Sequence, residues 1–437
     1  MISCAGYFLL AYGTPRANFT RLLTLFSTLF VVYGLVLVWP WPKRYVGIWL
    51  GLAVGFRLLL LLSVPLLSDD YARFVWDGRL LAAGFNPYLY LPSQLLHSPV
   101  FEQAGLSEAL FAQLNSPQYF TVYPPFNQAL FGVAAWVSDS NLLLNIGLLR
   151  TFILLAEIGT IGLLFTSKYP QRALIYALNP LVIIELTGNL HFEAVVVFFV
   201  LLAFRWLENR PVWSAGALVL AAGTKLLPLL FLPLLVAALG WRRGLRYGVL
   251  VGAGTLALFL PFLSIQLLQN MGSSLDLYFQ KFEFNASFYY LIGAVGFWVK
   301  GYNIIQTLGP ALSLVAAAVV VWLAFSKSAW LGVGAQGIFT RALLSLLVYY
   351  LGSTIVHPWY ITTLVALGSF TVFRFPVVWS VLLPLTYAAY SSVPVRENTW
   401  FLAVEYTILL LFVAFEWPNL PQNGVSKGHK LGEAAAP

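Results

Sequence analysis

The chain has 437 residues, of which 60% are hydrophobic and only 9% are charged, with a formal net charge of +8. Soluble domains usually carry about 25% charged residues, so this composition excludes a soluble globular protein. The positive charge does not indicate nucleic-acid binding, because the basic residues lie in short loops between apolar runs, the pattern of cytoplasmic loops in membrane proteins. A single cysteine, Cys4, excludes an internal disulfide and a thiolate metal site.

Apolar runs recur along the whole chain, and a membrane-spanning helix needs roughly 20 apolar residues. The long runs are Phe19–Trp39, Tyr45–Pro65, Leu142–Thr166, Tyr247–Gln266, Ile304–Phe325, Thr340–Val356 and Thr399–Glu416. Shorter runs, which predict half-helices or tightly packed spans, are Tyr123–Val137, Arg172–Thr187, Ala194–Trp206, Val212–Gly223, Leu226–Gly240, Pro358–Thr371 and Pro376–Ser391. Together they predict an all-α polytopic membrane protein with about 11 to 14 transmembrane helices.

The longest polar interruption, Leu66–Val122, follows the second run and contains five acidic residues but only two arginines. The preceding run begins beside Lys43 and Arg44, which the positive-inside rule places in the cytoplasm. We therefore expect the acidic segment on the periplasmic side. The predicted organisation is one transmembrane domain, residues 1–416, with a periplasmic catalytic loop at 66–122 and a flexible cytoplasmic tail at 417–437. The crossing between Tyr123 and Lys168 breaks the alternation, so either Tyr123–Val137 is re-entrant or one loop defies the rule.

Two adjacent carboxylates, Asp69 and Asp70, emerge at the end of an apolar run. If they are held close together, their repulsion raises the pKa of one and poises it as a base. In a helix, Asp70, Arg73 and Asp77 would share one face. The alternative is an interfacial helix cap held by salt bridges. Asp69 and Asp70 are our candidate catalytic residues, and the candidate substrate-binding residues beside them are Arg73, Trp76, Asp77 and Arg79.

Polar groups also interrupt the apolar runs at a predicted outside break, Gly188–Glu193. Hydrogen-bonding side chains in that setting suit sugar hydroxyls, and the alternative is a satisfied polar break between half-helices. A zinc site is disfavoured because the other histidines are scattered along the chain. The candidate binding residues in this break are Asn189, His191 and Glu193. Two motifs with turn-forming residues earlier in the chain add the candidates Asn86, Tyr88, Tyr123 and Gln128.

Cations and aromatic residues complete the predicted outer face. Lys225 lies between two short apolar runs, where a cation would suit a lipid phosphate or would snorkel to the interface. Arg396 lies in another predicted outside segment and is the second candidate for binding a lipid phosphate. Aromatic belts explain the aromatic residues of this face equally well. The remaining candidate binding residues are Asn285, His357, Trp359 and Tyr360.

Taken in order, these motifs resemble those of bacterial members of the GT-C superfamily, especially mannosyltransferase-like proteins. The ordered set runs from Asp69 to Tyr360 and comprises an acidic pair, Trp-Asp-Gly-Arg, Gly-x-Asn-Pro-Tyr, Tyr-Pro-Pro, Asn-Pro-Leu with Gly-Asn-x-His, Gly-x-Lys, Phe-Asn-x-Ser and His-Pro-Trp-Tyr. One departure is Glu193, where many relatives carry Asp two residues after the histidine.

The resemblance implies a bundle of many transmembrane helices in the inner membrane of a bacterium, with an active site facing the periplasm. It implies an inverting glycosyltransferase that moves a hexose, mannose-like, from a polyprenyl phosphate to a glycan or glycolipid acceptor, with Asp69 or Asp70 as the base. The absence of a Gly-rich dinucleotide fingerprint agrees with a lipid-linked donor. Membrane lipids are expected partners and nucleic acid is not. No cofactor is required, although the acidic residues have the ligand chemistry for a divalent cation.

Two other classes of protein would also be polytopic. A flippase or transporter of a lipid-linked sugar would have polar breaks near the middle of the membrane. No internal repeat of the hydropathy pattern is evident, and the polar residues gather on one face instead. A non-catalytic scaffold of glycan assembly would leave the acidic pair and Lys225 without a role. The glycosyltransferase is therefore the preferred interpretation.

Overall fold

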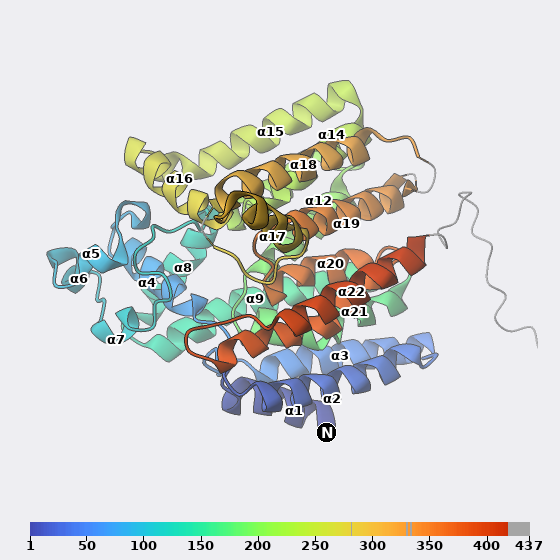
Figure 1. Cartoon of the computed structure of the whole chain (residues 1–437), viewed down its shortest axis with the longest axis horizontal. Coiled ribbons are helices and arrows are strands. Elements are labelled where there is room, and N and C mark those ends of the chain that lie inside the picture. The colour runs from blue at the N-terminus through green and yellow to red at the C-terminus, as the bar shows by residue number, and fades with distance from the viewer. Residues whose placement is uncertain (281, 329–330, 333, 418–437) are drawn as a thin grey trace, which may run out of the picture.

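A computed structural model describes residues 1–280, 282–328, 331–332 and 334–417. In these ranges the chain forms helices and no β-strand, apart from one isolated bridge between Phe284 and Ile355. The predicted tail at 417–437 lies outside the described residues, except for Trp417. Most of the long helices run along the longest axis of the molecule, as Figure 1 shows.

Within the described residues, five helices are long and apolar enough to cross a membrane. Their outward faces carry exposed apolar side chains such as Leu35, Leu256 and Leu411, as lipid contact requires. These five spans are α2 (Phe19–Val38), α9 (Leu142–Phe165), α15 (Trp241–Phe259) continued by η5 (Leu260–Phe262), α18 (Ile305–Phe325) and α22 (Thr399–Glu416).

A pair of helices, Pro180–Gly188 and Glu193–Trp206, is together long and apolar enough for a sixth span or a re-entrant loop, and it bends by 113° at its break; it is called the broken span below. Its first half ends in a π-helical turn, η3, in which the backbone is wider than in an α-helix. The buried Arg150 holds this turn by donating hydrogen bonds to the carbonyls of Thr187 (2.7 Å) and Gly188 (3.1 Å). The elements of this region are η2 (Pro170–Arg172), α10 (Ala173–Ala177), α11 (Pro180–Val182), η3 (Ile183–Gly188) and α12 (Glu193–Trp206).

Shorter helices fill the rest of the bundle, and the apolar ones of 10–17 residues within the described part of the chain are Ile2–Gly13, Pro211–Thr224, Leu227–Leu239, Phe288–Lys300, Gly337–Gly352 and Phe375–Ser391. Several of them are pairs of short helices joined end to end. They are α1 (Ile2–Gly13), α3 (Lys43–Leu59), α13 (Pro211–Thr224), η4 (Leu227–Phe231), α14 (Leu232–Leu239), α16 (Ile265–Gln280), α17 (Phe288–Lys300), α19 (Gly334–Gly352), η7 (Pro358–Tyr360), α20 (Ile361–Gly368), α21 (Phe375–Leu382) and η8 (Leu383–Ser391).

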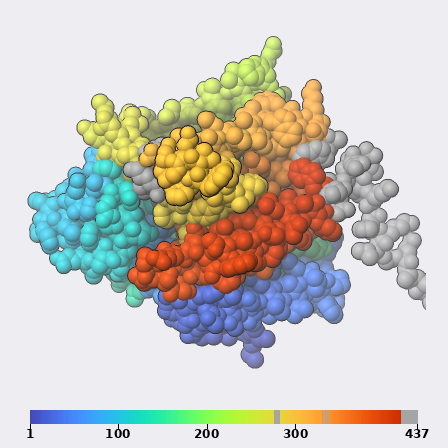
Figure 2. All heavy atoms as spheres, in the orientation of Figure 1, coloured from blue at the N-terminus to red at the C-terminus, as the bar shows by residue number. Residues whose placement is uncertain are grey.

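The acidic segment after α3 folds into short helices that gather at one end of the molecule (Figure 1). In the space-filling view they form a compact lobe beside the ends of the long helices (Figure 2). Gly78 allows α4 to approach α8 closely, because a Cβ atom at this position would lie 2.4 Å from the carbonyl oxygen of Phe131. The elements are α4 (Asp70–Ala82), η1 (Pro87–Leu89), α5 (Pro92–Leu95), α6 (Pro99–Gln103), α7 (Glu108–Phe111) and α8 (Pro125–Ser138).

The predicted all-α polytopic membrane fold is confirmed, and α2, α9, α18 and α22 match the predicted runs within one residue at each end. Other runs are shifted in their bounds; the run Tyr247–Gln266, for example, corresponds to α15 and η5, which together span Trp241–Phe262. Two further runs differ in their course. The run Tyr45–Pro65 yields only α3, which ends at Leu59, and the residues after it form hydrogen-bonded turns up to Ser63. The run Arg172–Thr187 breaks at Asn179, whose side chain caps a new helix that starts with Pro180.

Candidate active site

Asp70 lies at the start of α4 and directs its carboxylate towards the broken span. Its Oδ1 accepts a hydrogen bond from Asn115 Nδ2 at 3.1 Å. Its Oδ2 lies 3.9 Å from Nε2 of His191, and among the described residues no group donates a hydrogen bond to it. Burial raises the pKa of Asp70, while the Lys225 cation and the hydrogen bond from Asn115 act in the opposite direction. Asp70 is therefore a partly exposed carboxylate with one oxygen held and the other open.

Asp69 has a different environment although it is the adjacent residue. Its Oδ2 forms a salt bridge with the guanidinium of Arg16 at 2.6 Å. Arg16 lies between α1 and α2 and also stacks over the ring of Tyr390, 4.7 Å from its centroid. The Asp69 side chain is 39% exposed, so this ion pair is in contact with solvent. The predicted acidic pair is thus two carboxylates with separate partners.

His191 follows η3 at the bend of the broken span. Leu190, just before it, has a φ of 64°, a left-handed conformation that residues other than glycine rarely adopt. Nδ1 of His191 lies 2.8 Å from the carbonyl oxygen of Glu185. Because a carbonyl can only accept, Nδ1 must carry the proton and Nε2 is left as a hydrogen-bond acceptor in the neutral ring. Nε2 is buried and has no hydrogen-bond partner among the described residues.

Trp359 fixes the plane of the His191 ring. The two rings stack with centroids 3.8 Å apart and an angle of 16° between their planes. On its other face Trp359 stacks against His357, at 4.4 Å and 11°. The two imidazoles therefore cover both faces of the indole, and burial lowers the pKa of His357 to about 3, so this imidazole is neutral. The stack predicts a rigid histidine whose position is set before any substrate binds.

Lys225 lies at the C-terminal end of α13 and pairs with Glu193, the first residue of α12. Its ammonium group is also 5.7 Å from the centroid of the Tyr360 ring. Oε2 of Glu193 is buried without a hydrogen-bond partner within the described part of the chain. The structure thus joins the predicted Gly-x-Lys motif to the acidic residue of the predicted break, across 32 positions of sequence.

Arg73, Asp77 and Gln128 form a buried network in which both oxygens of the Asp77 carboxylate are paired, while Arg73 Nη2 and Gln128 Oε1 have no partner among the described residues. Arg73 Nε donates to Asp77 Oδ1 at 2.8 Å, and Gln128 Nε2 donates to Asp77 Oδ2 at 3.0 Å. Gln128 also donates to the hydroxyl of Thr121, so the network ties α4 to α8 and to the segment before it. Trp76 is fully buried and packs its ring against Phe101, which joins α4 to α6.

Four other predicted residues hold the loops of the acidic lobe. Arg79 donates to the carbonyls of Gly105 and Ser140. The side chain of Asn86 accepts from the backbone N–H of Tyr88, and the Tyr88 hydroxyl donates to the carbonyl of Tyr123 at 2.7 Å. The Tyr123 ring packs edge-on against Phe74 of α4, with centroids 5.0 Å apart.

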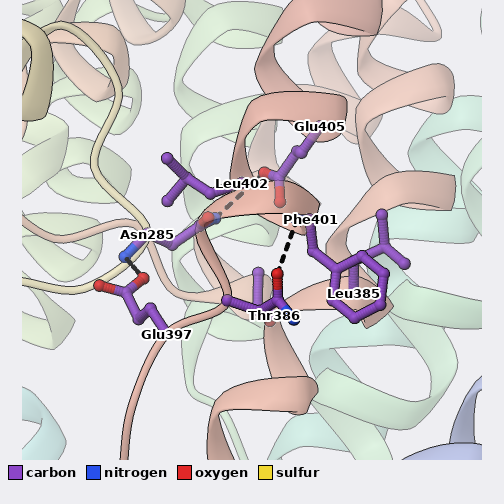
Figure 3. Close-up of a pocket in the computed structure, with 8 residues that line it drawn as sticks. Asn285, Leu385, Thr386, Glu397, Phe401, Leu402 and Glu405 are labelled. Atoms are coloured by element: carbon purple, nitrogen blue, oxygen red, sulfur yellow. Dashed lines mark hydrogen bonds between the residues drawn. The ribbon is translucent and has the colours of Figure 1, made fainter.

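Asn285 and Arg396 lie apart from the Asp70 carboxylate. Asn285 donates its backbone N–H to Glu397 and its side-chain amide to Glu405, as Figure 3 shows. These residues line a small cavity of about 10 Å³ at the start of α22. Phe284, the residue before Asn285, contacts one of the two histidines that stack on Trp359. Its ring centroid is 4.9 Å from that of His357. The Arg396 side chain is exposed, and no described residue pairs with it.

Arg16 and Asn115 were missed by the sequence analysis, and the sequence did not show that the carbonyl of Glu185 holds His191. A signal for Arg16 was available. If Lys43 and Arg44 are cytoplasmic, the other end of the preceding span is outside, and the arginines there, Arg16 and Arg21, run against the positive-inside rule. Asn115 gave no comparable signal, because it lies in an irregular loop far along the chain from Asp70.

The site gathers residues from helix junctions into one arrangement of carboxylates, a neutral histidine and two cations. Carboxylates can accept a proton from a hydroxyl, and the cations Arg16 and Lys225 can stabilise an anionic leaving group. Among the described residues, no three His, Cys, Asp or Glu side chains are arranged to hold a metal ion. The predicted divalent cation therefore stays a prediction.

A polytopic all-α chain with this acidic site at its helix junctions has the architecture of an integral-membrane glycosyltransferase of the GT-C type. Residues 15–241, just over half of the chain, match the MptA_B family, described as alpha-(1->6)-mannopyranosyltransferase, N-terminal domain. The chain belongs to this mannosyltransferase family, and the predicted enzyme class is confirmed. No curated protein matches the chain significantly. The matched region contains Arg16, both candidate catalytic acids, His191 and Lys225.

Proposed function

We propose that this protein transfers a mannosyl unit from a polyprenyl phosphate to the 6-hydroxyl of a mannose-containing glycan, at the periplasmic face of a bacterial inner membrane. The observation that carries the proposal is the Asp70 carboxylate, whose open Oδ2 lies beside His191 at the junctions of membrane helices. The family description supports mannose and the 1→6 linkage. The buried apolar setting of the bundle supports a donor that is itself a lipid.

In the proposed reaction, Asp70 Oδ2 accepts the proton of the acceptor hydroxyl as that oxygen attacks C1 of the mannosyl donor. A new C1–O bond forms on one face, while the bond from C1 to the phosphate oxygen breaks on the other. The electron pair of the broken bond leaves with the polyprenyl phosphate. Since the configuration at C1 inverts, an α-linked product requires a donor in which the phosphate is β-linked.

Charge on the leaving group explains the two cations. The phosphodiester of the donor carries one negative charge, and the released phosphate monoester carries two. Arg16 pairs with Asp69, and Lys225 is close enough to Asp70 to lower its pKa, so each cation can offset part of the charge that develops. Each is also paired with an acid, Glu193 or Asp69, which keeps its position fixed before the donor binds.

The test is transfer by purified protein in detergent from a panel of synthetic polyprenyl-phosphate sugars, with octyl α-mannoside as acceptor. Transfer of mannose by the wild type, abolished in the double variant Asp69→Asn/Asp70→Asn, is the expected result. The product linkage is then read by NMR. Lipid binding without turnover across all donors would contradict the proposal and would favour a flippase of lipid-linked sugar.

A further inference from the structure

Two hydrogen-bond acceptors face each other in the site with nothing between them. Asp70 Oδ2 and His191 Nε2 are 3.9 Å apart, and Nε2 is buried without a partner among the described residues. A buried acceptor that is left unpaired is unfavourable, and this one lies beside the open carboxylate oxygen of a candidate base. The two atoms therefore suit a ligand that donates a hydrogen bond to each of them.

The histidine cannot supply the missing donor by changing its tautomer. Its Nδ1 proton is committed to the carbonyl of Glu185 at 2.8 Å, and ring rotation is blocked by the stack on Trp359. Glu185 is in turn fixed by the hydroxyl of Tyr387, at 2.5 Å, and by Asn189. His191 thus presents Nε2 as a fixed acceptor, and the ligand must donate to it.

We infer that Asp70 and His191 form a subsite for two neighbouring hydroxyls of one acceptor sugar. The attacking hydroxyl donates to Asp70 Oδ2, and a second hydroxyl of the same ring donates to His191 Nε2. Hydroxyl donors lie about 2.7–2.8 Å from their acceptors, so acceptors 3.9 Å apart can each take one of two adjacent hydroxyls. His191 is then a specificity-determining residue that orients the acceptor for attack.

The inference rests on the proposed function and makes it more specific. When the 6-hydroxyl of a mannoside attacks, the closest second hydroxyl is the one at C4, because C6 is attached to C5. The 4-hydroxyl is therefore assigned to His191, and the 2- and 3-hydroxyls are not. Trp359, with both faces covered by imidazoles, acts as a positioning residue for His191 and does not itself stack on the sugar.

The experiment compares octyl α-mannoside with its 2-deoxy, 3-deoxy and 4-deoxy analogues, all of which keep the 6-hydroxyl. For the wild type we expect kcat/KM to fall about 10- to 100-fold for the 4-deoxy analogue alone, as for a lost hydrogen bond to a buried acceptor. In His191→Asn, whose amide can still donate to Glu185 but cannot reach the position of Nε2, the 4-deoxy penalty should disappear. In His191→Gln, whose longer amide can place its oxygen near that position, part of the penalty should remain.

Two readouts separate failure of the inference from failure of the proposed function. If the wild type transfers mannose but His191→Asn keeps the full 4-deoxy penalty, the inference is overturned and the proposed function stands. An equal penalty for all three deoxy analogues would overturn it too. If the wild type transfers from no donor, both proposals are overturned. Intrinsic tryptophan fluorescence and thermal unfolding of each variant show whether the stack around Trp359 survives the substitution.

Discussion

Helix α4 carries two aspartates on one face, two turns apart, and their surroundings differ sharply. Around Asp77, Arg73 and Gln128 occupy both carboxylate oxygens and all three side chains are buried, although Arg73 Nη2 and Gln128 Oε1 have no hydrogen-bond partner among the described residues. Around Asp70, one carboxylate oxygen is open and lies 3.9 Å from Nε2 of His191, which has no partner in the described part of the chain. The Asp77 carboxylate therefore has no oxygen left for a ligand, whereas the Asp70 carboxylate has one.

The comparison teaches how to separate structural from functional charges in a membrane protein. Both regions contain carboxylates, cations and amides, so composition alone does not distinguish them. What distinguishes them is whether both oxygens of the carboxylate are paired within the protein. We therefore expect substitutions near Asp77 to act on stability, and substitutions near Asp70 to act on transfer.

The largest expected effect is on transfer by Asp70→Asn. An amide keeps the size of the side chain and can still accept from Asn115, but it cannot take a proton. We expect kcat/KM to fall about 10²- to 10⁴-fold, the usual contribution of a general base, with little change in thermal unfolding. Asp69→Asn is the matched control and should lose no more than about tenfold. A larger loss for Asp69→Asn than for Asp70→Asn would assign the base to Asp69.

Asp77→Asn should act in the opposite way. It leaves the buried Arg73 cation without its counter-ion, and breaking a buried pair from one side costs about 3–5 kcal/mol. The expected result is a lower unfolding midpoint in detergent, with near-normal activity per folded molecule at low temperature. The double variant Arg73→Met/Asp77→Asn, which removes both charges, should recover much of the stability. Normal stability of Asp77→Asn would show that the network is not structural.

The pH dependence of transfer should report the environment of Asp70. Its pKa is raised by burial, and a base acts only when deprotonated, so kcat/KM should fall as the pH drops through this raised pKa. Lys225 lowers the pKa of Asp70, so Lys225→Met should move the acid limb to higher pH and reduce kcat/KM about 10- to 100-fold. Lys225→Arg keeps the positive charge and should leave the limb in place. A limb that moves to lower pH in Lys225→Met would contradict this assignment.

The smallest expected effect belongs to Arg16→Gln. Its salt bridge with Asp69 is partly exposed, and such pairs contribute about 0–1 kcal/mol, so thermal unfolding should change little. Loss of a cation beside the donor phosphate should raise the KM for the donor a few-fold and leave the KM for the acceptor unchanged. Arg396→Gln is a suitable control, because Arg396 is exposed and no described residue pairs with it. An equal rise in donor KM for both variants would remove the special role of Arg16.

Much of the fold could be predicted from the sequence, because it depends on local properties. Apolar runs of sufficient length predict α2, α9, α18 and α22 almost to the residue. The polar break before Glu193 was also predicted, and it is the bend of the broken span. Helices such as α11 and η3 were not anticipated, since a buried arginine and an asparagine cap divide one apolar run into several pieces.

The sequence predicted most residues of the site but not the contacts between them. The i, i+7 spacing placed Asp70 and Asp77 on one face, but the partner that occupies Asp77 is Gln128, 51 positions along the chain. Likewise, no local pattern pairs Lys225 with Glu193, or Arg16 with Asp69. Tertiary contacts decide which carboxylates are paired within the protein and which keep a free oxygen. The sequence therefore gives both kinds as candidates and does not distinguish them.

The π-helical turn Ile183–Gly188 has a consequence for how the site could be altered. A π turn holds one residue more than the α-helical turn that it replaces. Arg150 donates hydrogen bonds to the last two carbonyls of this turn. Removing one residue would close this turn into an α-helical one and change which carbonyls Arg150 can reach. The position of His191 would change as well, because its Nδ1 is held by the carbonyl of Glu185 within the same turn. The spacing of this segment is therefore as much a part of the candidate site as the identity of its residues.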